Sequence, residues 1–161
     1  MKEPFAEQMT LRPVRNDDIP AMTAHRLAYL QELQGEREPD YMQKLEKELS
    51  GYFSEGIRSG YYYAVVAESG GRILGYGAMV IRRIPGDMDM PTRLEADILN
   101  MYTLPSARRQ GVGSRILEHL LLKARELGLV KLALHTSKDG EQLYRSFGFS
   151  EPEYPYLELE L

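Results

Sequence analysis

The chain of 161 residues contains no cysteine. Without thiols it forms no disulfides, holds no thiolate zinc site and has no cysteine nucleophile. It also lacks an apolar run long enough to span a bilayer, and residues 1–14 contain no apolar stretch of signal-peptide length. These absences fit a reducing cytoplasm, which is the location we expect, with no membrane partner.

An excess of positive charge is missing as well. The sequence has 20 Lys and Arg against 24 Asp and Glu, which gives a net charge of −4 and a pI near 5.5. Because nucleic-acid binding needs a basic stripe, we expect no nucleic-acid partner. A mildly acidic protein suits a cationic substrate, but a charge of this size does not decide the matter.

The composition is that of an ordinary globular protein, with 43% hydrophobic and 27% charged residues. We find no repeat, low-complexity tract or linker, so we expect one domain over residues 1–161. The hydrophobic pattern predicts strands at 9–14, 61–84 (a hairpin around Ser-Gly-Gly), 93–104, 129–136 and 154–161, and helices at 15–33 (capped by Asn16 or Asp17), 41–58, 108–127 and 137–149 (closed by Gly148). A helical crossover implies parallel strands and a hairpin antiparallel ones, so the expected fold is α/β (α+β) with a mixed central sheet.

Two glycines stand one residue apart in RRQGVGSRIL, residues 108–117, at the start of a predicted helix. The first turn of a helix offers unpaired amides and the positive end of the dipole. Gly111 and Gly113 would leave room for a phosphate there, and Arg108 and Arg109 would add charged donors. The alternative is a tight strand-to-helix turn that needs glycine for its dihedral angles, with solvated arginines.

RRQGVG matches the Arg/Gln-x-x-Gly-x-Gly/Ala signature of the GNAT superfamily, the acetyl-CoA-dependent N-acetyltransferases. ADILNMYTLPSARRQGVGSRIL (residues 96–117) resembles its strand-loop-helix unit, and LHTSKDGEQLYRSFGF (residues 134–149) resembles its second motif. The order of the elements is similar nearly from end to end. The resemblance implies the GNAT fold, with a sheet splayed at the cofactor site and flanked by helices.

The resemblance implies two sets of backbone contacts with coenzyme A. The pyrophosphate would bind the motif that begins at Arg108, through the amides of Arg109, Gln110, Gly111, Val112, Gly113 and Ser114. The pantetheine arm would pair with the preceding strand at Met101, Tyr102 and Thr103. Many members carry Asn where this chain has Ser137, a shorter donor, and Ala where it has Gly140.

Tyr144 matches the tyrosine that family members often place near the cofactor sulfur. A phenol with a pKa of about 10 stays protonated and donates to a thiolate whose parent thiol has a pKa of about 8.5. This makes Tyr144 the expected general acid. The alternative is a tyrosine packed between helix and sheet with its hydroxyl satisfied.

Asp97 falls at the position of an acidic residue that serves as general base in some members. Strand alternation predicts that Glu95, Asp97, Leu99 and Met101 share one side of the sheet. An unperturbed aspartate and an alkyl ammonium differ by about 6.5 pKa units, roughly 9 kcal/mol, so a water relay or a raised pKa would be needed. Asp97 would otherwise bind a cationic amine or be a solvated edge residue.

The acceptor pocket is less well defined by the sequence. In the family it is usually walled by the first two helices, their connecting loop and the loop before the motif strand. Here these contribute Tyr29, the acidic Glu36, Glu38 and Asp40, and Met88 and Met90; the acidic group would attract an amine or form an exposed turn. His25, His119 and His135 form no ligand set by their spacing, so we expect no metal; His119 would be structural or solvated, and His135 is a candidate for a secondary acid-base role.

Together these observations predict an N-acetyltransferase that moves an acetyl group from acetyl-CoA directly to a primary amine of a small molecule or peptide. The alternatives are a non-catalytic acyl-CoA-binding or sensing module and a protein-interaction domain without cofactor. The resemblance also allows a homodimer, because dimers are common among relatives.

Overall fold

The computed structural model describes residues 8–161 and is built on one five-stranded sheet of order β1-β2-β3-β4-β5. Neighbouring strands are antiparallel except for β4 and β5, which are parallel, as the sequence predicts. The strands are β1 (Thr10–Pro13), β2 (Tyr62–Ser69), β3 (Arg72–Pro85), β4 (Thr92–Thr103) and β5 (Lys131–Ala133). The helices are α2 (Ile19–Gln34), α3 (Pro39–Ser59), α4 (Val112–Glu126) and α5 (Lys138–Ser146), with 3-10 turns η1 (Asn16–Asp18) and η2 (Pro105–Ala107).

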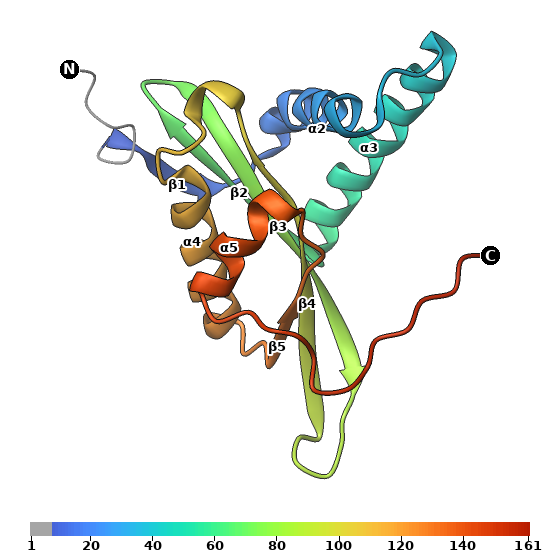
Figure 1. Ribbon diagram of the computed structural model, residues 1–161, viewed down its shortest axis with the longest axis vertical. Coiled ribbons are helices and arrows are strands. Elements are labelled where there is room, and N and C mark those ends of the chain that lie inside the picture. The colour runs from blue at the N-terminus through green and yellow to red at the C-terminus, as the bar shows by residue number, and fades with distance from the viewer. Residues whose placement is uncertain (1–7) are drawn as a thin grey trace.

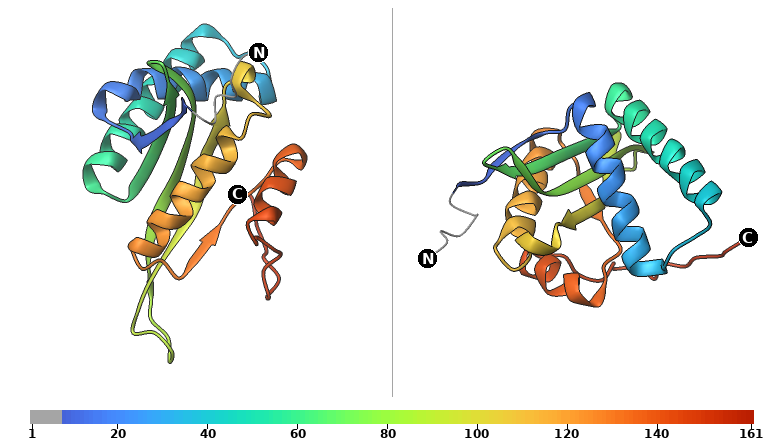
Figure 2. Two further views of the ribbon diagram at one scale, coloured as in Figure 1. Left: turned by 90° about the vertical axis from the view of Figure 1, so that its left-hand side faces the viewer. Right: turned by 90° about the horizontal axis from the view of Figure 1, so that it is seen from above.

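Helices cover both faces of the sheet, α2 and α3 on one and α4 and α5 on the other (Figures 1 and 2). Along β2, Val65 and Ala67 pack with the α4 and α5 side, and Ala64 and Val66 with the α2 and α3 side. This burial on both faces explains why the sequence of β2 is apolar without alternation.

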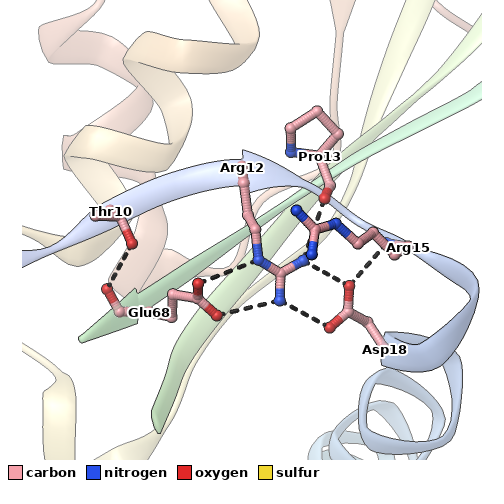
Figure 3. Close-up of polar contacts among 6 residues, drawn as sticks. All are labelled: Thr10, Arg12, Pro13, Arg15, Asp18 and Glu68. Atoms are coloured by element: carbon pink, nitrogen blue, oxygen red, sulfur yellow. Dashed lines mark hydrogen bonds and ion pairs between the residues drawn. The ribbon is translucent and has the colours of Figure 1, made fainter. Parts of the chain in front are cut away.

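The entry to α2 differs from the predicted cap at Asn16 or Asp17. A 3-10 turn intervenes, and Asp18 stands at the N-cap position of α2. Its carboxylate accepts two hydrogen bonds from Arg12, at 2.7 and 3.0 Å, and one from the Arg15 amide at 2.7 Å. Arg12 also binds Glu68 through two bonds of 3.1 Å, so one guanidinium joins β1, β2 and the start of α2 (Figure 3).

Two hairpins connect the antiparallel strands. The predicted Ser-Gly-Gly turn between β2 and β3 is confirmed, with Gly70 and Gly71 both at positive φ (57° and 75°), as the favoured two-residue turn requires. The β3–β4 hairpin extends beyond the other strands, with the loop of residues 86–91 at its tip (Figure 1).

A bulge in β4 overturns the predicted alternation. Tyr76 and Ala78 of β3 face Tyr102 and Leu99, so β4 carries one extra residue here, and Asn100 adopts φ 52°. Met101 consequently packs with the α4 cluster rather than beside Asp97, Glu95 and Leu99. The face shift follows from the period-2 geometry of strands, in which one inserted residue reverses every later side chain.

The predicted strand at 154–161 is wrong for this chain in isolation. These residues form no strand, and β5 is shorter than the predicted 129–136. The alternating pattern is present, but a strand also needs a partner for its backbone, and residues 154–161 pair with none. Among residues 8–161, none of the helices combines the length and apolar character that crossing a membrane requires.

Candidate active site

Strands β4 and β5 form a fork. They pair only at Glu95–Lys131, Ala96–Leu132 and Asp97–Ala133, and β4 then continues to Thr103 without β5 beside it. An edge of this kind leaves backbone amides and carbonyls for an extended ligand. The predicted residues Met101, Tyr102 and Thr103 lie on this stretch, although the Thr103 carbonyl already accepts a 3.1 Å hydrogen bond from Arg108.

The loop before α4 has the backbone shape of an anion site. Arg109 and Gly111 both adopt positive φ, 61° and 79°, and Gly111 is the N-cap. The Arg115 amide makes the first helical bond, to the Gly111 carbonyl, so the amides of the preceding first turn have no helical acceptor. Successive amides that converge in this way form a concavity for anions at the positive end of the helix dipole.

The two glycines of the motif have different tasks. Gly111 needs its left-handed φ of 79°. Gly113 has ordinary dihedrals, but a Cβ there would lie 3.4 Å from Leu143 of α5 and 3.9 Å from the Thr103 hydroxyl of β4. The first turn of α4, the end of β4 and α5 therefore meet at Gly113.

Two side chains of the motif, those of Arg108 and Gln110, bind other parts of the chain. Arg108 makes two 3.1 Å bonds to Glu32 of α2 and lies 5.9 Å from the centre of the Tyr102 ring. Gln110 donates to the Ser106 carbonyl at 3.0 Å, and Arg109 is exposed. The guanidinium of Arg108 is thus held by α2, and its backbone amide donates to the Pro105 carbonyl at 3.4 Å.

Helix α5 brings Ser137 and Tyr144 to the same region. Ser137 is the N-cap, and its hydroxyl accepts from the Gly140 amide at 3.3 Å. A Cβ at Gly140 would lie 2.9 Å from the Thr136 hydroxyl, so alanine at this position would require a shift.

Tyr144 is buried in the core against Phe149. Burial raises the pKa of Tyr144 to about 12, and the nearby Tyr29 hydroxyl adds to the rise. Within residues 8–161 its hydroxyl makes no hydrogen bond. The phenol is accordingly protonated over the physiological range and has a proton to donate.

An aromatic pocket lies between α2 and the bulge of β4. Its lining comprises Met22, His25, Arg26, Tyr29, Tyr76, Asn100 and Tyr102. His25 Nδ1 lies 3.2 Å from the Tyr76 hydroxyl, and burial lowers the pKa of His25 below its usual value of 6.5. Tyr29 and Tyr102 pack with ring centres 5.5 Å apart. The pocket thus places a neutral imidazole beside aromatic walls, and its volume of about 10 Å³ has room for about one water molecule.

The carboxylates of β4 are held by cations. Asp97 stands at the fork, 37% exposed, and Arg82 binds both of its oxygens at 3.0 and 3.1 Å. Glu95 is buried and pairs with Arg93 at 2.6 Å and Lys131 at 3.3 Å. Of the two, only Asp97 is accessible at the fork.

The comparisons with known proteins agree with this geometry. Residues 60–151 match the sequence profile of the acetyltransferase (GNAT) domain. The chain belongs to the GNAT acetyltransferase family. A predicted acetyltransferase with acetyl-CoA from Clostridium acetobutylicum superposes with TM-score 0.82 at 28% identity, over 94% of this chain and 96% of that one. A GCN5-related N-acetyltransferase from Ralstonia eutropha gives 0.76 at 25% identity, over 94% and 98%. No curated protein sequence matches.

Sequence reasoning about this GNAT acetyltransferase missed part of its pocket. Of the residues predicted to wall the acceptor site, Tyr29 lines this aromatic pocket, whereas Met88 and Met90 lie on the distant hairpin loop, and Glu36, Glu38 and Asp40 are not among the lining residues. The sequence does not predict three further lining residues, His25, Tyr76 and Asn100. No local sequence pattern determines which face of α2 packs against the bulged part of β4. His119 of α4 lies 3.0 Å from the Tyr63 hydroxyl, and the side chain of His135 is 83% exposed. Residues 8–161 bring together no group of three His, Asp or Glu able to hold a metal.

Proposed function

We propose that this acetyltransferase moves an acetyl group from acetyl-CoA to a primary amine bound at the opening of the pocket between α2 and the β4 bulge, whose interior has room for about one water molecule. The observation that carries the proposal is the convergence at Gly113, where an anion-binding helix start, an unpaired strand edge and the helix of Tyr144 meet. The Clostridium structure described above as holding acetyl-CoA has the same fold, which supports this choice of donor.

Two features of the chain support coenzyme A as the carrier of the acetyl group. We propose that the amides of the loop and first turn of α4 bind its pyrophosphate and that the free edge of β4, with Ser137 opposite, holds its pantetheine arm. When bound, acetyl-CoA would supply a thioester whose carbonyl carbon is attacked by the amine, with coenzyme A as the leaving thiol. The residues around it orient the two partners, which provides much of the rate in a direct transfer.

Tyr144 is proposed to keep a proton ready for the leaving sulfur. Its raised pKa, about 12, means that the phenol remains a donor while a thiolate forms. Without a cysteine in the chain there is no thiol for a covalent acetyl-enzyme intermediate, which favours direct attack by the amine.

Asp97 is proposed to receive the proton of the attacking amine through a water molecule, since Arg82 already occupies both of its oxygens. His25 is a second candidate, favoured by its place in the pocket and by its lowered pKa, which keeps the imidazole neutral at pH 7.

The decisive assay measures release of free thiol from acetyl-CoA in the presence of a panel of primary amines, with acceptor-free hydrolysis subtracted. A parallel melting experiment with coenzyme A reports binding, since a ligand at 100 times its dissociation constant adds about 2.7 kcal/mol of stability. Acetyl transfer to an amine supports the proposal. Binding without transfer to any amine would indicate a sensing module instead, and no stabilisation at all would indicate an interaction domain.

A further inference from the structure

Arg26 of α2 is a cation at the aromatic pocket without an acidic partner. It is among the lining residues, and its guanidinium carbon lies 5.6 Å from the centre of the Tyr29 ring. Burial raises the pKa of Tyr62, and the nearby charge of Arg26 opposes part of that rise. The Tyr62 hydroxyl accepts a 2.7 Å hydrogen bond from Asn100, another lining residue, so the guanidinium lies on the pocket side of α2. Among residues 8–161, no carboxylate forms an ion pair with Arg26.

Two other arginines near the proposed site are already paired. Arg108 binds Glu32 through two hydrogen bonds of 3.1 Å, and Arg82 binds both oxygens of Asp97. A partly buried charge is costly to leave without a partner, and the planar fork of a guanidinium fits a carboxylate through two parallel hydrogen bonds. Arg26 is therefore the guanidinium of this pocket that has a carboxylate-binding fork to offer a ligand.

The charges around the pocket favour an anion. No acidic side chain is among its lining residues. His25 adds no charge at pH 7, because burial lowers its pKa, and its Nδ1 lies 3.2 Å from the Tyr76 hydroxyl. The lining is thus positive, although the whole chain has a net charge of −4. Such a lining repels a second cation and attracts a negative group, so a polyamine fits it poorly.

The pocket lies beside the strand edge at which the acetyl group is proposed to bind. The ring of Tyr102 packs against Tyr29 in the pocket, and the backbone of Tyr102 belongs to the unpaired stretch of β4. The volume of about 10 Å³ has room for about one water oxygen, so one oxygen of a carboxylate enters it and a larger group stays at the opening. An acceptor held in this way has its amine close to its carboxylate, as in an α-amino acid, where a single carbon joins the two groups.

We propose that the acceptor is a free α-amino acid whose carboxylate binds Arg26 at the opening of the pocket, an assignment that rests on the acetyl transfer proposed above. The reaction forms a bond between the α-nitrogen and the acetyl carbon and breaks the carbon–sulfur bond of acetyl-CoA. The nitrogen loses one proton and the sulfur gains one, so the products are an N-acetyl amino acid and coenzyme A. Pairing with Arg26 also offsets the negative charge that stabilises the neighbouring ammonium, which favours the neutral amine that attacks.

Amino acids and their α-amides test this assignment, because the two differ chiefly in the charge of the carboxyl group. Release of thiol from acetyl-CoA is measured at pH 8 with phenylalanine, leucine and methionine, each against its α-amide. We expect kcat/KM of the best acid to exceed that of its amide by about 10- to 100-fold, as for hydrogen bonds to a charged group. The amine of the amide is the weaker base and is more often neutral at this pH, so the bias opposes the expected result. Equal values, or a preference for the amides, overturn the carboxylate site and leave the transfer to amines standing.

Variants of Arg26 connect the preference to this side chain. Arg26→Gln should lower kcat/KM for the acid by about 10- to 100-fold and leave that for the amide unchanged. Arg26→Lys should restore part of the preference, because lysine retains the charge but lacks the planar fork. Arg83→Gln, at an exposed arginine of β3, is the control and should alter neither substrate. An equal loss for acid and amide in Arg26→Gln would show a general disturbance of the pocket and would overturn the proposal.

Binding provides a readout that does not depend on turnover. Calorimetry of phenylalanine, leucine and methionine with the protein saturated with coenzyme A should show binding to the wild type and to Arg83→Gln, and a loss of at least tenfold in affinity in Arg26→Gln. If the wild type acetylates no amine but binds these acids through Arg26, the carboxylate site stands and the proposed transfer fails. If it neither binds nor acetylates them, the carboxylate site is rejected.

Discussion

The guanidinium of Arg108 and the carboxylate of Glu32 are joined by two hydrogen bonds of 3.1 Å. The pair connects helix α2, which lines the proposed acceptor pocket, with the loop that leads into the proposed phosphate site. It also pairs the positive charge of Arg108 with a carboxylate. We therefore expect the proposed phosphate site to attract an anion through backbone amides and the helix dipole more than the sequence suggests.

Removing this carboxylate should strengthen cofactor binding. In Glu32→Gln, the positive charge of Arg108 is no longer balanced by a carboxylate near the start of α4. We therefore expect the dissociation constant of coenzyme A to fall several-fold at low salt, and the gain in affinity to be smaller at high salt. Titration calorimetry at two ionic strengths measures this. Glu36→Gln, an exposed carboxylate in the loop after α2, is the control and should change little. Weaker binding in Glu32→Gln would mean that the pair positions the loop.

Substitution of Tyr144 by Phe should slow acetyl transfer by about 10²-fold, because the leaving thiolate loses a positioned proton donor. The affinity for coenzyme A should be unchanged, since the ring still packs against Phe149. Single-turnover rates and calorimetry separate the two effects, and Tyr41→Phe, at an exposed tyrosine of α3, is the control. In the wild type, the pKa of about 12 predicts no loss of rate from this group between pH 7 and 10. An unchanged transfer rate would remove Tyr144 from the mechanism.

The proton acceptor is identified by two variants and their pH profiles. We expect Asp97→Asn to lower kcat/KM by about 10²-fold and His25→Gln to leave it within a few-fold. If His25 were the base, the order would reverse. Activity would then disappear as the pH falls through the lowered pKa of His25, below 6.5, because the protonated imidazole accepts nothing. Profiles from pH 5 to 9 distinguish the two assignments.

Features set by local sequence were predictable. The Gly70–Gly71 turn and the parallel β4–β5 pair follow from a few adjacent residues or from chain order, and the helix of the glycine motif was also predicted, although it begins at Val112 rather than at 108. The bulge at Asn100 was not predictable, because one inserted residue leaves no periodic signal in the sequence. The only local hint is that asparagine tolerates a positive φ better than most residues. His25 became a site candidate only through the packing of α2 against the sheet, and residues 154–161 have the pattern of a strand but no partner in one chain.

The different tasks of the two motif glycines predict different losses. Gly111→Ala forces a side chain into the left-handed region and should lower the free energy of unfolding by about 1–2 kcal/mol. Gly113→Ala should leave stability nearly unchanged, because its Cβ makes ordinary contact at 3.4 Å, but it fills space at the proposed cofactor site and should weaken coenzyme A binding by about tenfold or more. Urea unfolding and calorimetry provide the two readouts. Unaltered affinity in Gly113→Ala would show that its gap does not admit the cofactor.

The Asp18 carboxylate should make folding sensitive to acid. Hydrogen bonds from Arg12 are the main cause of its lowered pKa, with the Arg15 amide contributing. Because the folded-state pKa lies below the unfolded value near 3.9, the stabilisation is complete above that value and is lost as the pH falls through the folded pKa. Asp18→Asn should therefore cost about 1.5–3 kcal/mol at pH 7, the range for hydrogen bonds to a charged group, and less at pH 3. Asp17→Asn, at the exposed neighbour, is the control, and urea unfolding at both pH values measures the difference. An equal cost at the two pH values would show that Asp18 acts through packing rather than through its charge.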